Sequence, residues 1–364
     1  MHELLSKLPE IAEKIRVLET NREKLGLFLR EIADKVELSG DVLEPNIIYT
    51  ATPDLLDGKK VIAIDGGLSQ HSYHGIDLIL TRAVAVVFDY LGGKLDKVGY
   101  HPHSIVTPTL TIISDPYSDE EFFLSSSLER ERGEIELAAE CFSKFPPQLL
   151  LLDGSVVPHG KDKPAKTSAA WERYESVLRS FISLYKSSSG SLLAGCVEDS
   201  RGRSFCEIVS GSILSELNSP KAEELRKILA STRDTNLLYY TLRKGERTAV
   251  FRYSKNPSNH PILSDLQPYG EKIFSFYLKT AEFDRPVRID FFSIGNPIET
   301  ANKIASIVLS LSPHNSYGFP APLIEADFRA KLQENDVSSL HDQLVDRVGI
   351  TPSLMKLRRE QRPF

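Results

Sequence analysis

The chain has 364 residues, of which 41% are hydrophobic and 26% charged, and its formal net charge is −6. This composition is typical of a folded globular protein and excludes a disordered chain. No apolar run approaches the roughly 20 residues of a membrane-spanning helix, and the N-terminal residues lack the apolar core of a signal peptide. The three cysteines have no CxxC spacing, which excludes a disulfide scaffold and a cysteine-built zinc site. We therefore expect a protein of the cytoplasm with no membrane segment.

The first 45 residues contain apolar side chains at helical spacing with charges between them. This pattern predicts one long amphipathic helix or a hairpin of two helices. Such an arm cannot bury its apolar stripe alone, so it must pack on the rest of the protein or on a second subunit. We accordingly divide the chain into an N-terminal helical arm, residues 1–45, and a domain, residues 46–364.

The first part of this domain, about residues 59–200, has the pattern of three strands followed by alternating helices and strands. Hairpins followed by crossover connections give a mixed sheet with helices on its faces, which is an α/β fold. The strands are expected at 59–67, 76–90, 104–113, 148–155 and 191–199, and the helices at 119–145 and 168–186.

The pattern is less regular after residue 200. Residues 255–269 are rich in Pro and Asn and predict a long exposed loop. We expect the C-terminal part from about 297 to 335 to close a site on the core. The additional strands are expected at 248–254, 273–280 and 287–294, and the additional helices at 297–311, 321–334 and 337–347.

Acidic residues follow two of the apolar strands. Asp65 follows the run VIAI, and Asp153 follows the run LLLL. Neighbouring parallel strands bring such residues to the same edge of a sheet, where open α/β folds bind their ligands. The alternative is that each Asp merely stabilises a turn with the Gly that follows it. Two such residues in this topology favour a functional site.

Two further segments offer acids to the same site. On the helix at 119–145, Glu136 stands between Ile135 and Leu137, which places part of its surroundings toward the core, and Glu134 is the alternative. A late helix carries Asp327 in its first turns. Asp65, Glu136, Asp153 and Asp327 would form an oxygen-only cluster, which selects Mn²⁺ or Mg²⁺ over zinc. Paired ions of this kind support phosphodiester cleavage.

Five short motifs lie in order between about residues 60 and 335. They are IAIDGG at 62–67, Arg132-x-x-Ile135-Glu136, LLLDGS at 150–155, GCVEDSR at 195–201 and GFPAPLIEAD at 318–327. Each motif is weakly specific alone. The ordered set resembles the NurA family of DNA-end-processing nucleases, which have an RNase H-like core.

This resemblance implies Mn²⁺-favouring cleavage of DNA, 5′→3′ on single strands and from duplex ends, with endonuclease activity on single strands. It implies metal binding by Asp65, Glu136 and Asp153. It also implies a homodimer that works with a hexameric HerA-type ATPase, a translocase, in the resection of double-strand breaks.

The chain departs from the family pattern at four positions. The last motif usually reads Tyr-Pro-x-x-Leu-x-x-Ala-His, but here Phe319 and Asp327 replace its Tyr and His. Gly67 stands where the first motif usually has Ser, and Glu198 stands where the fifth strand usually has Lys. Asp327 can still bind a hard metal ion.

Two other functions remain open, an inactive regulatory subunit of a DNA translocase and a ribonuclease of the same fold class. The negative net charge does not exclude nucleic acid, because binding depends on local patches. Basic runs are more often solubilising surface, and one such run lies in a Pro/Gly loop. The expected DNA-binding residues are Lys161, Lys163, Lys166, Arg201 and Phe319.

Overall fold

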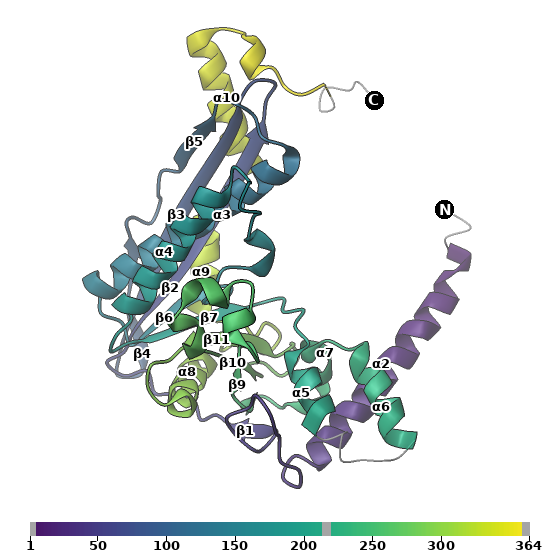
Figure 1. Ribbon diagram of the computed structural model, residues 1–364. Helices are drawn as coiled ribbons and strands as arrows, with labels where there is room; N and C mark the ends of the chain where they lie inside the picture. The colour runs from purple at the N-terminus through teal and green to yellow at the C-terminus, as the bar shows by residue number, and fades with distance from the viewer. Residues whose placement is uncertain (1–4, 213–219, 359–364) are drawn as a thin grey trace. The chain divides into compact units, whose positions relative to one another are not determined.

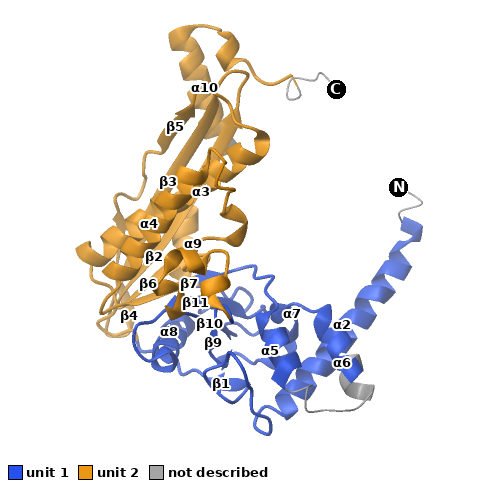
Figure 2. Ribbon diagram, in the orientation of Figure 1, with its two compact units in different colours: residues 1–55, 196–255, 273–320 blue, residues 56–195, 256–272, 321–364 orange. Residues whose placement is uncertain are grey.

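The computed structural model describes residues 5–212 and 220–358. The chain divides into two compact units (Figure 2). Unit 1 comprises residues 1–55, 196–255 and 273–320, and unit 2 comprises residues 56–195, 256–272 and 321–364. The division into an arm and a single domain stays a prediction. Within the described ranges, no helix is long and apolar enough to cross a membrane.

Unit 2 is built on a mixed sheet with the strand order β4-β3-β2-β6-β7 (Figure 1). Strands β2, β3 and β4 form an antiparallel meander, and β6 pairs with β2 in parallel. A further strand, β5, pairs with the beginning of β3. This is the strand order of an RNase H-like core, so the predicted fold class is confirmed. The bounds are β2 Lys60–Ser72, β3 Asp77–Leu91, β4 Lys94–His101, β5 Thr109–Ile113, β6 Leu149–Asp153 and β7 Leu192–Val197, of which the first four residues lie in unit 2.

The centre of this sheet is apolar because helices cover it. Residues 61–64 of β2 and 149–152 of β6 are almost completely buried, as expected of strands that are enclosed on both faces. Helices α3 and α9 both contact β2, and α4 packs on α3. The helices of unit 2 are α3 Asp119–Lys144, α4 Trp171–Ser187, α9 Ala321–Ala330 and α10 Glu334–Val348. Its short 3-10 turns are η1 Gly160–Asp162, η2 Pro257–Asn259, η3 Leu263–Leu266, η4 Tyr269–Lys272 and η5 Pro352–Leu354.

The prediction of a long exposed loop at 255–269 is wrong. Ile262, Leu263 and Leu266 are fully buried, so this segment contributes to the core although it contains no long helix or strand. A contact across the chain also anchors it, because Lys163 forms an ion pair with Asp265. Its Pro and Asn residues indicated irregular backbone correctly, but irregular backbone is not always exposed.

Unit 1 contains an antiparallel sheet in the order β1-β8-β10-β11, with β9 paired to β10. The strand predicted at 248–254 is interrupted: Thr248 ends β8, and residues 251–252 form β9. The strands are β1 Ile48–Thr50, β8 Glu246–Thr248, β9 Phe251–Arg252, β10 Ile273–Leu278 and β11 Val287–Phe292. The helices are α2 Leu8–Glu31, α5 Ser204–Ser212, α6 Pro220–Ala230, α7 Asp234–Thr241 and α8 Pro297–Leu311.

The N-terminal arm contains one long helix, α2, whose two halves have different surroundings. In its second half, Leu25 and Leu29 are buried in the core of unit 1, where α2 packs on α7. In its first half the same stripe is about half exposed. The exposed members are Leu8, Ile11, Ile15 and Leu18.

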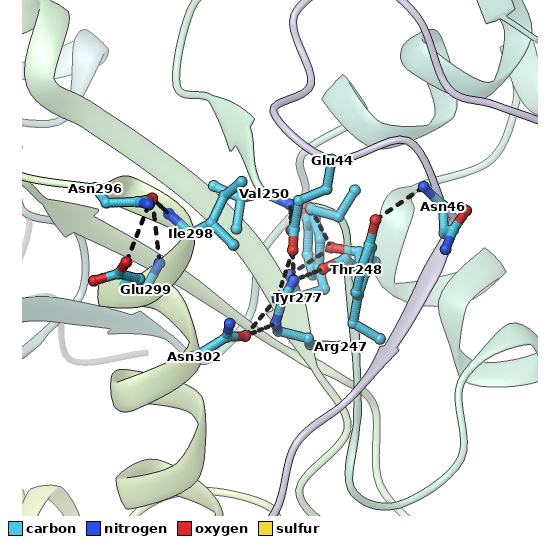
Figure 3. A network of polar contacts seen from close by, with 12 residues as sticks. Glu44, Asn46, Arg247, Thr248, Val250, Tyr277, Asn296, Ile298, Glu299 and Asn302 are labelled. Atoms are coloured by element: carbon cyan, nitrogen blue, oxygen red, sulfur yellow. Dashed lines mark hydrogen bonds and ion pairs between the residues drawn. The ribbon is translucent and has the colours of Figure 1, made fainter.

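A buried ion pair joins three segments of unit 1 (Figure 3). Arg247 on β8 is 1% exposed and donates to both carboxylate oxygens of Glu44 at 2.7 Å. The guanidinium also donates to Asn302 on α8. Removing one partner of such a pair strongly destabilises the folded state, because the remaining charge stays buried without its partner.

Candidate active site

Two consecutive glycines on β2 lie directly against α3 and α9. A Cβ atom on Gly66 would lie 2.2 Å from Oε1 of Glu134, and one on Gly67 would lie 1.8 Å from the carbonyl oxygen of Ala330. Successive strand residues face opposite sides of a sheet, so the two helices approach β2 from opposite faces. The strand expected at 59–67 is longer than predicted, because β2 continues through these glycines to Ser72. They are glycines because two helices come too close for any side chain.

The close approach of Glu134 to Gly66 brings its carboxylate within electrostatic reach of Asp65. Asp65 and Glu134 are both buried, 7% and 6% exposed. Asp153, at the end of β6, acts electrostatically on Glu134. Asp327, on α9, acts on Asp65. Four carboxylates from β2, α3, β6 and α9 therefore form one acidic cluster in unit 2, and three of them are residues that the sequence predicts.

Burial and mutual repulsion make this cluster unfavourable when all its members are charged. Burial raises the pKa of Asp65 to about 6, and the neighbouring Asp327 contributes in the same direction. Burial raises the pKa of Glu134 to about 8, and Asp65, Glu131 and Asp153 add to the effect. A divalent cation bound to oxygen ligands would relieve this repulsion.

The structure places Glu136 outside this cluster. Its side chain is 50% exposed and pairs with Arg132 at 3.1 Å, and Ser180 on α4 donates to it at 3.4 Å. Two residues along a helix correspond to a rotation of about 200°, so Glu136 and Glu134 point in nearly opposite directions. A signal was present in the sequence, because Glu134 shares its stripe with the buried Ala138 and Cys141.

A basic residue that the sequence interpretation missed lies among these acids. Arg130 on α3 forms an ion pair with Glu134 one helical turn away, and Asp65, Asp153 and Glu131 also act on it. Among the residues that the structure describes, no three His, Cys, Asp or Glu side chains are arranged to hold a metal ion as they stand. The guanidinium instead lies among the carboxylates.

The residues present nevertheless fit a hard divalent cation. The donors are all carboxylate oxygens, the ligands that Mn²⁺ and Mg²⁺ prefer. Gly66 leaves a space that the Glu134 carboxylate fills next to Asp65. On α9, Glu325 is already paired with Arg329 and Tyr100, each at 2.8 Å. Asp327 is therefore the acid of that helix that faces the cluster.

The five predicted DNA-binding residues belong to both units. Lys163 pairs with Asp265 and donates to the carbonyl oxygen of Pro261 at 2.6 Å, so it anchors the segment 256–272. Lys161 and Lys166 are exposed in unit 2. Arg201 and Phe319 belong to unit 1, where Arg201 is exposed and Phe319 is 5% exposed.

An RNase H-like sheet that carries acidic residues from two strands and two flanking helices defines the structural class of this protein. The family model of the NurA domain matches residues 59–332, which covers three quarters of the chain. The protein therefore belongs to the NurA family.

Solved NurA structures have the same fold. The NurA nuclease from Sulfolobus solfataricus has a TM-score of 0.60 and 16% sequence identity, over 96% of this chain and 97% of that one. A NurA bound to dAMP and manganese has a TM-score of 0.55 and 11% identity, over 97% and 98%. A NurA with manganese has a TM-score of 0.54 and 10% identity, over 95% and 99%. No curated protein sequence matches the chain.

Proposed function

We propose that this protein is a metal-dependent deoxyribonuclease that hydrolyses phosphodiester bonds in DNA. The observation that supports it most directly is the cluster of Asp65, Glu134, Asp153 and Asp327. Membership of the NurA family supports the same function, and so does the relative of this fold bound to dAMP and manganese. Mn²⁺ or Mg²⁺ would be the cofactor.

In this proposal the four carboxylates would bind the cation from different elements of the fold. Asp65 and Asp153, each one residue past the last pair of the parallel strands β2 and β6, would hold the cation from the sheet. Glu134 would approach it from α3, where Gly66 gives it room. Asp327 would add a fourth oxygen ligand from α9. The bound ions would activate water and stabilise the leaving oxygen of the phosphodiester.

The finer activities are part of the same proposal. We infer 5′→3′ exonuclease activity and endonuclease activity on single strands from the family resemblance. We also infer a homodimer in the cytoplasm that works with a HerA-type hexameric translocase in the resection of double-strand breaks. The half-exposed apolar stripe on the first half of α2 supports a second subunit, because an amphipathic helix normally buries such a face.

A cleavage assay with charge-neutral variants tests the proposed site. End-labelled single-stranded DNA and a matched RNA are incubated with Mn²⁺, Mg²⁺ or EDTA. We expect cleavage of DNA that needs the metal and falls at least about a hundredfold in Asp65→Asn, Asp153→Asn and Glu134→Gln, because each removes a metal ligand.

The matched control is Glu136→Gln, which changes an acid on the same helix outside the cluster and should cleave at close to the wild-type rate. Equal losses in Glu134→Gln and Glu136→Gln would contradict this site. Cleavage of RNA in preference to DNA would identify a ribonuclease. No cleavage with any metal would favour the regulatory subunit.

A further inference from the structure

Arg130 is a basic side chain that interacts with members of the acidic cluster, and nothing in the proposed reaction yet uses it. Its guanidinium forms an ion pair with Glu134 and interacts with Asp65 and Asp153. It also interacts with Glu131 and Asp162. The guanidinium of Arg130 therefore interacts with five carboxylates from four segments of unit 2.

This arrangement differs from an ordinary ion pair on a helix. An exposed pair four residues apart contributes only a few tenths of a kcal/mol, and it involves two charges. Glu134 is 6% exposed, so the loss of its counter-charge would leave a carboxylate buried without compensation. The Arg130 side chain is itself 32% exposed, so one of its edges is open to solvent.

We propose that Arg130 is the internal counter-ion of the metal site, which balances the carboxylates while no divalent cation is bound and competes with that cation for the same oxygens. This inference rests on the proposed function. It agrees with the ion pair between the guanidinium and the buried carboxylate of Glu134, which is one of the proposed metal ligands.

If Arg130 competes with the metal ion, its removal should change the metal affinity in the opposite direction from that expected of a purely structural role. If Arg130 merely held Glu134 in place, its removal would disorder a ligand and weaken metal binding. If Arg130 competes with the cation, its removal takes away a like charge from the metal site. One charge at close range changes the affinity for another by about tenfold or more.

Calorimetric titration of the full chain with Mn²⁺, without DNA, distinguishes the two roles. We expect Arg130→Met to bind Mn²⁺ at least about tenfold more tightly than the wild type and to melt at a lower temperature in EDTA. Saturating Mn²⁺ should restore most of that loss in melting temperature.

The matched control is Arg132→Met, two residues further along the same helix. Arg132 has nearly the same exposure, 33%, but pairs with Glu129 at 3.0 Å and Glu136 at 3.1 Å outside the cluster. Its replacement should leave the Mn²⁺ affinity unchanged. Arg130→Gln, which is polar and uncharged, provides the same test if Arg130→Met does not fold.

Weaker or unchanged Mn²⁺ binding in the Arg130 variants, with a wild type that binds Mn²⁺, would overturn the counter-ion role and leave the metal site intact. If neither the wild type nor either Arg130 variant binds Mn²⁺, both the metal site and the counter-ion role are overturned.

Discussion

The two glycines of β2 allow a sharp test of how the site is built, because a methyl group at each meets a different kind of neighbour. At Gly67 the added Cβ would lie 1.8 Å from the carbonyl oxygen of Ala330 and 2.8 Å from its carbonyl carbon. Both atoms belong to the backbone at the end of α9, which cannot rotate away. The helix would have to move by roughly 1 Å or more to restore a normal contact distance.

We expect Gly67→Ala to destabilise the protein by about 2–3 kcal/mol, near the upper end of the usual cost of overpacking. For a unit of this size that corresponds to a fall in melting temperature of about 4–12 °C. Gly67→Ser should have a similar effect, although the family usually has Ser at this position. Because α9 carries Asp327, DNA cleavage should fall in the same variants.

Gly66→Ala is the comparison, because its Cβ meets the flexible end of the Glu134 side chain at 2.2 Å. We expect the side chain to swing away, with a smaller loss of stability and a loss of metal affinity of about 10–100-fold, as when the groups that orient a ligand are disturbed. Thermal unfolding and Mn²⁺ titration measure the two effects. Equal melting temperatures for Gly67→Ala and the wild type would refute the close packing of α9 on β2.

Three further perturbations test other parts of the molecule. Arg247→Met should lower the free energy of unfolding by about 3–5 kcal/mol in urea titrations, because it leaves Glu44 buried and unpaired; a loss below about 1 kcal/mol would contradict that. Burial lowers the pKa of Lys279 from 10.5 to about 8, so between those pH values the folded state binds fewer protons than the unfolded state. The stability of the wild type should therefore rise with pH relative to that of Lys279→Met. Parallel pH profiles of stability for the two proteins would refute this prediction. Ile15→Asp on the exposed stripe of α2 should halve the mass of a homodimer measured by light scattering without changing the helical circular dichroism, whereas an unchanged mass would exclude this stripe from the interface.

The sequence predicted the acids on the strands better than the acid on the helix. Asp65 and Asp153 each follow four apolar residues, and such runs are strongly determined because both faces of the strand are enclosed. On α3 the choice between Glu134 and Glu136 depends on the rotation of the helix about its axis. Apolar neighbours of Glu136 on both sides suggested the wrong face, whereas the spacing of Glu134, Ala138 and Cys141 indicates the right one.

The remaining errors have a common physical cause, which is that local signals do not report contacts between distant segments. Two adjacent glycines favour a turn locally, but at Gly66 and Gly67 the approach of two helices decides the residue type. The segment 255–269 has the composition of a loop, but its three buried apolar residues make it part of the core. Arg130 was overlooked because its importance lies in the five acids that the fold brings around it.

The different lengths of the strands around the site have a mechanical consequence. Strand β2 pairs with β6 only from Val61 to Ile64, whereas it pairs with β3 as far as Ser72. Up to Ile64, β2 has a partner strand on both sides; from Asp65 onward it has one only on the side of β3. Gly67, which packs against α9, lies in this second part of the strand. Like Asp65, Asp153 stands one residue past the last pair of β2 and β6, at the end of the stiff interior of the sheet. Asp327 is coupled through α9 to the more easily twisted extension of β2. Bending of that extension would change the separation of Asp327 from the other three acids while leaving their own spacing nearly constant.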